Sequence, residues 1–149
     1  MTRFIFTVLS ISYITLIFLL AGSSIVSYLS VFNPYSLLHI PLYGILALLI
    51  LFSFVPFKFN HFKQEKSYIQ RFNNLMTHLP NNLMPRFIIA GFIALIVAVA
   101  DEIYQTSILG RDGSFTDVLL DAIGIGLVLL LIHRIFRWKI SSKPNPPLI

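Results

Sequence analysis

The chain contains no cysteine, and only 11% of its 149 residues are charged. The lack of cysteine excludes disulfide bonds, thiolate catalysis and cysteine-ligated metals. The low charge excludes an ordinary soluble domain, in which about a quarter of the residues are charged. Hydrophobic residues make up 56% of the sequence and occur in long runs, which indicates an integral membrane protein.

Four apolar runs are long enough to cross a bilayer as helices. We therefore expect one domain, residues 1–149, of the all-α class: a polytopic membrane protein folded as a four-helix bundle. The expected spans cover about residues 4–21, 37–57, 87–108 and 115–136, and residues 137–149 form a C-terminal tail.

Residues 60–79, between spans two and three, have a different pattern. At 100° per residue, Tyr68, Phe72 and Leu79 share one arc, whereas Lys66 and most other polar residues occupy the opposite arc. This periodicity predicts an amphipathic helix in the headgroup layer, with its basic side chains toward anionic lipid. The alternative is a soluble loop packed on the bundle.

The basic residues indicate the orientation of the spans. Ten of the eleven Lys and Arg residues lie at the N-terminus, between spans two and three, or at the C-terminal end, and only Arg111 lies elsewhere. A four-span topology places these three segments on one side, and the positive-inside rule makes that side cytoplasmic. Both termini and the amphipathic helix are then cytoplasmic, and the net positive charge needs no nucleic-acid partner.

Most of the acidic residues lie around the outward-facing connection between spans three and four. Counted from the basic anchors at about 1.5 Å per residue, Asp101 and Asp121 lie roughly 20–22 Å from the cytoplasmic end. Tyr43 and His39 of span two lie roughly 22–28 Å from that end. Polar groups of three spans are therefore expected in one layer just inside the outer boundary. Five of the six acids belong to this region: Asp101, Glu102, Asp112, Asp117 and Asp121.

Nine residues of this layer are candidate binding residues, because their i, i+3 and i, i+4 spacings let each set line one helix face. A partly buried cluster that is so acidic either keeps some carboxyls protonated or admits a cation. The cation can be a metal, a lipid amine or a substrate ammonium. The candidates are His39, Tyr43, Asp101, Glu102, Gln105, Arg111, Ser114, Asp117 and Asp121.

Each candidate also has a purely structural interpretation. Ser114 and Asp117 have the spacing of a helix N-capping box, with Asp in place of Glu or Gln. Arg111 either clamps a phosphate or carboxylate or neutralises a neighbouring acid, and Tyr43 is compatible with plain packing. Adjacent Asp101 and Glu102 are expected to face different ways, one into the cavity and the other toward a neighbour or the headgroups.

Several further expectations follow from spacing. His39 has no acidic residue close to it in sequence, so we predict no metal site and no cofactor. Ser114 has no adjacent base in the sequence, and no catalytic residue is assigned. Gly124 and Gly126 are expected to let a neighbouring helix come close.

Motifs in spans two to four carry a family resemblance. They read His39-x-x-x-Tyr43, then Asp101-Glu102-x-x-Gln105, Gly110-Arg111 and Ser114-x-x-Asp117-x-x-x-Asp121-x-x-Gly124. This set resembles the VanZ-like family of small bacterial membrane proteins. Three positions depart from the family pattern: Leu109 replaces the usual Pro, Asp121 the usual Asn, and Tyr35-Ser36 a common Asp-Lys pair. The resemblance implies a cell-envelope role in the bacterial inner membrane, without a known reaction.

Two functions are compatible with these observations, and neither enzymatic activity nor its absence is predicted. The first is binding of, or action on, a lipid headgroup or lipid-linked envelope precursor at the outer polar site, with membrane lipids as partners. The second is a structural or accessory subunit of a larger membrane complex, whose other membrane subunits are then the partners. A proton or cation path is disfavoured, because no charged residue continues the polar layer toward the cytoplasmic side.

Overall fold

The computed structural model describes residues 2–23, 35–55, 83–109 and 113–141, and the structural statements below concern these residues. They form four α-helices and one short 3-10 helix, and no strand occurs within these ranges. The helices are α1 (Thr2–Ala21), η1 (Tyr35–Leu38), α3 (His39–Phe54), α5 (Met84–Thr106) and α6 (Phe115–Ser141). Four helical stretches are long and apolar enough to cross a membrane, counting η1 from Ser36 together with α3. The predicted all-α class with four candidate spans is thus confirmed, and the predicted amphipathic helix at 60–79 lies outside the described residues.

The helix ends differ from the expected boundaries by a few residues. Helix α5 begins at Met84, before the expected start at Phe87, with Pro85 in its first turn. Proline suits this position because the first N–H groups of a helix have no partner within the helix. Helix α6 continues to Ser141 and so includes the first part of the expected C-terminal tail.

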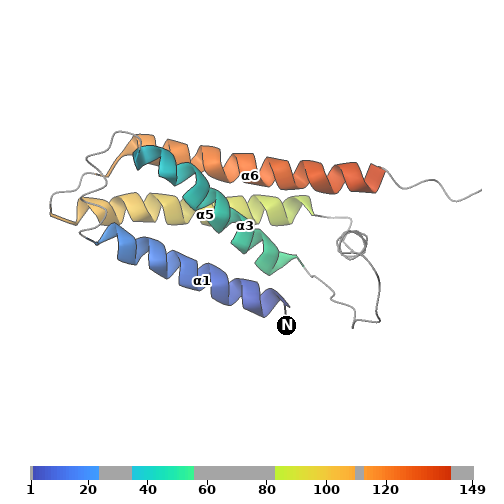
Figure 1. Ribbon diagram of the computed structural model, residues 1–149, viewed down its shortest axis with the longest axis horizontal. Helices are drawn as coiled ribbons and strands as arrows, with labels where there is room; N and C mark the ends of the chain where they lie inside the picture. Colours follow the sequence, from blue (N-terminus) through green and yellow to red (C-terminus); the bar gives the residue numbers. More distant parts are fainter. Residues whose placement is uncertain (1, 24–34, 56–82, 110–112, 142–149) are drawn as a thin grey trace, which may run out of the picture.

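The helices lie side by side, and successive helices run in opposite directions (Figure 1). Helix α3 contacts each of the other three long helices. One end of the bundle holds the last turns of α1 and α5 and the first turns of α3 and α6, and we call it the polar end. The opposite end, which holds the starts of α1 and α5, is called the basic end.

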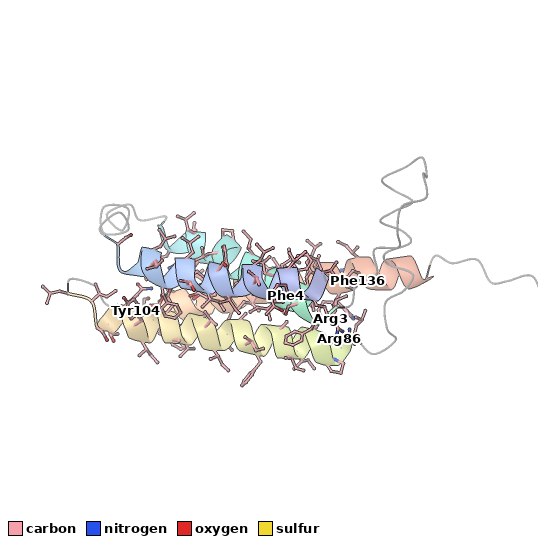
Figure 2. All side chains as sticks on the ribbon, turned by 90° about the horizontal axis from the view of Figure 1, so that it is seen from below. Arg3, Phe4, Arg86, Tyr104 and Phe136 are labelled. Carbon is pink, nitrogen blue, oxygen red and sulfur yellow. The ribbon has the colours of Figure 1, made fainter. Side chains whose placement is uncertain are left out.

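Two arginines fix the helix ends at the basic end. The guanidinium groups of Arg3 and Arg86 each donate a hydrogen bond of 3.1 Å to the backbone oxygen of Phe54, at the end of α3. Cations are favourable there because the last carbonyls of a helix lack partners and carry partial negative charge. Figure 2 shows both arginines near Phe136 of α6 and far from Tyr104 of α5. The basic residues at the starts of α1 and α5 therefore share one end of the bundle.

Small side chains face inward and large apolar ones face outward along α5. Ala90, Ala94 and Ala98 are completely buried, whereas Ile88 and Phe92 are about two-thirds exposed, at 68% and 64%. A soluble protein generally buries its large apolar side chains instead. Small residues at helix interfaces are typical of membrane bundles, because they let helices pack closely while large side chains meet lipid.

Glycine allows α3 and α6 to approach each other closely near the polar end. A Cβ atom on Gly124 of α6 would lie 2.1 Å from the backbone oxygen of Ile40, and one on Gly44 of α3 would lie 2.8 Å from Val128. A Cβ on Gly126 would have no neighbour within 4 Å. The expected close approach is therefore found at Gly124, and the expectation for Gly126 was wrong because that position faces away from α3.

Candidate functional site

His39 and Asp121 pair across the interface between α3 and α6. His39 begins α3, and its Nδ1 lies 2.9 Å from Oδ1 of Asp121, almost two turns into α6. The close approach at Gly124 makes this distance possible, because Ile40 follows His39 and Gly124 lies three residues after Asp121. The pair is buried, with no exposed surface left on Asp121.

Tyr43 and Gln105 hold the carboxylate of Asp101 on the adjoining side of the cluster. The Tyr43 hydroxyl donates to Asp101 Oδ2 at 3.0 Å, and Gln105 Nε2 donates to the same oxygen at 3.1 Å. The rings of Tyr43 and His39 stack with centroids 6.2 Å apart. Within one turn of α3, Tyr43 thus binds Asp101 of α5 and His39 binds Asp121 of α6.

Glu102 connects the end of α5 to the start of α6. Its Oε2 accepts a hydrogen bond of 2.8 Å from the backbone N–H of Ser114, and its Oε1 accepts one of 3.3 Å from Gln105. The Ser114 hydroxyl accepts a hydrogen bond of 3.4 Å from the backbone N–H of Asp117, as an N-cap residue does. In a capping box the acid three residues on would accept from the Ser114 N–H. Here Glu102 of another helix accepts that bond, so only half of the expected capping box forms within α6.

Asp101 and Glu102 are both directed into the bundle. The expectation that they face different ways is confirmed, because Asp101 accepts from Tyr43 of α3 whereas Glu102 accepts from the backbone of the neighbouring Ser114. Adjacent residues on a helix point about 100° apart, so each acid reaches a different partner helix. Five side chains of the cluster are almost completely buried, with these exposed fractions: Tyr43 0%, Asp121 0%, Asp101 3%, Glu102 6% and His39 7%.

The cluster becomes more accessible toward the polar end. Tyr43 and Asp121 are fully buried, whereas Gln105, Ser114 and Asp117 are half-buried. Asp117 lies in the first turn of α6, where its negative charge is favourable near the partial positive charge of the helix N-terminus. The cluster therefore extends from the interior of the bundle to the level of the helix ends.

Hydrogen bonds bring together seven of the nine candidates: His39 with Asp121, Tyr43 and Gln105 with Asp101, and Glu102 with Gln105 and Ser114. The predicted convergence of polar groups from three spans in one layer is confirmed for these residues. The backbone N–H of Asp117 donates to Ser114, which connects Asp117 to the cluster. Arg111 and Asp112 lie outside the described residues. The role of the nine candidates as binding residues stays a prediction.

The sequence analysis missed two groups of α3 that help to position the site, and it missed a set of three possible metal ligands from different helices. Gly44 lets α6 approach, and its signal is a small residue within a run of large aliphatic ones. The Leu42 backbone oxygen accepts a hydrogen bond of 3.2 Å from Tyr13, which attaches α1 to the site-bearing part of α3. His39, Glu102 and Asp121 each place a possible metal-ligand atom within 4.8 Å of the others. That grouping joins three helices, so no local spacing could reveal it.

Comparisons of the chain with protein-family models, with curated proteins and with solved structures find no match.

Proposed function

We propose that this chain is a VanZ-like integral membrane protein whose polar end binds the headgroup of a membrane lipid or lipid-linked cell-envelope precursor. The observation that carries the proposal is the buried cluster of His39, Tyr43, Asp101, Glu102 and Asp121, supplied by three helices at one end of an otherwise apolar bundle. Ionisable groups within a membrane-spanning region are costly and are generally retained for function.

The shape of the cluster supports a headgroup ligand. Its half-buried members lie at the helix ends, where the headgroup layer meets a bilayer-spanning bundle, and its buried members lie one to two turns deeper. The outward faces of α5 and α6 beside it carry exposed apolar residues such as Ile103 and Leu119. A ligand with a polar head and apolar chains can therefore contact the cluster and these faces together.

The charge distribution supports a definite orientation in a bacterial inner membrane. Arg3 and Arg86 lie at the basic end near Phe136 (Figure 2), and Arg134 lies two residues before Phe136 in α6. The positive-inside rule makes that end cytoplasmic. Both termini and the proposed amphipathic helix at 60–79 are then cytoplasmic, and the polar end faces outward. Labelling of a single cysteine introduced at Ser114 by a membrane-impermeant thiol reagent outside intact cells tests this, and labelling only after lysis would reverse the orientation.

The motif residues on which the VanZ-like resemblance depends are also the residues that pair across helices. His39 and Tyr43 of the earlier motif contact Asp121 and Asp101 of the later ones. This pairing supports a shared site as the reason for the motif, and membership of the family remains part of the proposal.

Lipid binding by the purified chain tests the proposed function. We expect phosphatidylethanolamine to bind the wild-type protein in detergent, as measured by native mass spectrometry and by titration. Asp121→Asn and Arg111→Ala are each expected to weaken this binding at least tenfold, which is about 1.4 kcal/mol. Arg134→Ala, at the other end of the bundle, is the control and should leave the affinity within about twofold.

The same experiment separates a binding site from an internal brace. If the cluster only stabilises the bundle, Asp121→Asn lowers the unfolding temperature and leaves the lipid affinity unchanged. Unchanged affinity in both Asp121→Asn and Arg111→Ala, in protein that elutes as a folded species, would overturn the proposed function.

A further inference from the structure

Three side chains with metal-binding groups converge at the α3–α5–α6 junction. His39 offers an imidazole nitrogen, and Glu102 and Asp121 each offer a carboxylate oxygen. These three atoms lie within 4.8 Å of one another, and all three residues are buried. Three protein ligands that leave a further position open are typical of zinc sites that bind a substrate or water.

One carboxylate oxygen of Asp121 is buried without a hydrogen-bond partner among the described residues. This oxygen is Oδ2, and the residue has no exposed surface. A buried polar atom without a partner costs about 1–3 kcal/mol, and more if the group is charged. An ion coordinated by this oxygen would remove that cost.

The described residues balance the acidic charge at this junction only in part, because His39 offers at most one positive charge beside Asp121. Glu102 and Asp121 together carry a charge of −2 when ionised, and a divalent ion would neutralise it. The described residues at the polar end include no Lys or Arg, because Arg3, Arg86 and Arg134 lie at or near the basic end. Carboxylates buried in this way are stable only when a positive charge or a proton compensates them.

The donor types select among divalent ions. Calcium and magnesium prefer ligand sets made of oxygen alone, whereas imidazole together with carboxylates suits zinc and related first-row ions. Bonds of about 2.0–2.2 Å hold neighbouring ligand atoms about 3–4 Å apart. The His39–Asp121 pair at 2.9 Å is already close to that spacing. The separations from Glu102 to the other two ligand atoms are no more than 4.8 Å, which side-chain rotation can bring to the same range.

We infer that His39, Glu102 and Asp121 bind one divalent first-row transition-metal ion of the Zn²⁺ type at the junction of α3, α5 and α6. The ion joins the three helices at the polar end and presents an open coordination position toward the helix ends. The site coincides with the proposed headgroup site, but it needs no lipid, so the two proposals can fail separately.

Metal titration of the full chain tests this inference. Protein purified in detergent, stripped with a chelator and freed of lipid is titrated with Zn²⁺ by calorimetry, with metal analysis after desalting. We expect one Zn²⁺ per chain, and at least tenfold weaker binding in His39→Gln and Glu102→Gln. His133→Gln is the matched control, because His133 packs on Phe87 near the basic end, and its affinity should equal that of the wild type. Zn²⁺ binding well below one per chain, or equal losses in His39→Gln and His133→Gln, would overturn the inference.

Cobalt substitution gives a second measurement that a merely structural role would not affect. Co²⁺ bound by one imidazole and two carboxylates is expected to give visible absorption bands that change in His39→Gln and stay unchanged in His133→Gln. Identical Co²⁺ spectra for wild-type protein and for His39→Gln would also contradict the site. Because Asp121→Asn can impair folding, His39→Gln and Glu102→Gln carry the test.

Discussion

Gly124→Ala is expected to destabilise the protein by about 3 kcal/mol, at the upper end of the range for overpacked interiors. The added Cβ would lie 2.1 Å from the backbone oxygen of Ile40 and 2.8 Å from its carbonyl carbon. No side-chain rotation can relieve a clash with backbone, so α3 must move away from α6. That movement also lengthens the His39–Asp121 contact, so binding at the polar end weakens together with stability. Thermal and denaturant unfolding in detergent, followed by circular dichroism, measures the effect.

Gly126→Ala is the matched control for Gly124→Ala. The two glycines lie on the same helix, and a Cβ on Gly126 meets nothing within 4 Å. Alanine is also a better helix former than glycine, by about 0.8–1.0 kcal/mol in water. Gly126→Ala should therefore be neutral or slightly stabilising. Equal unfolding temperatures for the two variants would show that α3 and α6 do not approach each other at Gly124.

Tyr43→Phe is expected to destabilise the protein by about 1.5–3 kcal/mol, the range for hydrogen bonds to charged groups. The Tyr43 hydroxyl donates to Asp101 Oδ2 at 3.0 Å, and both residues are buried. Removal of the hydroxyl takes one donor from a carboxylate that water cannot readily reach. The unfolding free energy in detergent is the measurement, and lipid binding should weaken in parallel.

Tyr13→Phe provides the comparison for Tyr43→Phe. Tyr13 also donates to α3, but to the backbone oxygen of Leu42 at 3.2 Å, and it is only half-buried. Hydrogen bonds between helices in membrane proteins average about 0.6 kcal/mol, and we expect a loss of that size. An equally small loss in Tyr43→Phe would contradict a strong hydrogen bond from Tyr43 to an ionised Asp101.

The four helices and the level of the site could be predicted from the sequence because each depends on distance along the chain. A run of apolar residues long enough to span a bilayer is visible directly, as in residues 87–100. The depth of His39 and Asp121 follows from the rise of a helix and the positions of basic residues near the opposite end. Each estimate uses one helix at a time, and the structure agrees in bringing His39 and Asp121 together at one end of the bundle.

The orientation of side chains could be predicted only where a second residue on the same helix fixed the face. Gly124 lies three residues after Asp121 and so shares its face, whereas Gly126 lies about 140° from Asp121 around the helix. The same helical geometry would have separated the two glycines before the fold was known. The orientation of Glu102 could not be predicted in this way, because the groups near it, Ser114 and Asp121, belong to a different part of the chain. The three-residue metal grouping likewise depends on how three helices pack, which spacing within one helix does not contain.

Cysteine cross-linking across the α3–α6 interface tests the central claim most directly, and the chain has no native cysteine to interfere. The pair His39→Cys with Asp121→Cys is placed in a chain with a protease site between residues 58 and 83. In membranes, a short bifunctional thiol reagent should join the two halves, so that they migrate together on a denaturing gel after cleavage. The control pair, His39→Cys with His133→Cys, is separated by about 18 Å more along α6 and should stay unlinked. Efficient linking of the first pair alone is the result that we predict, and no linking of that pair, or equal linking of both, would contradict a shared polar layer.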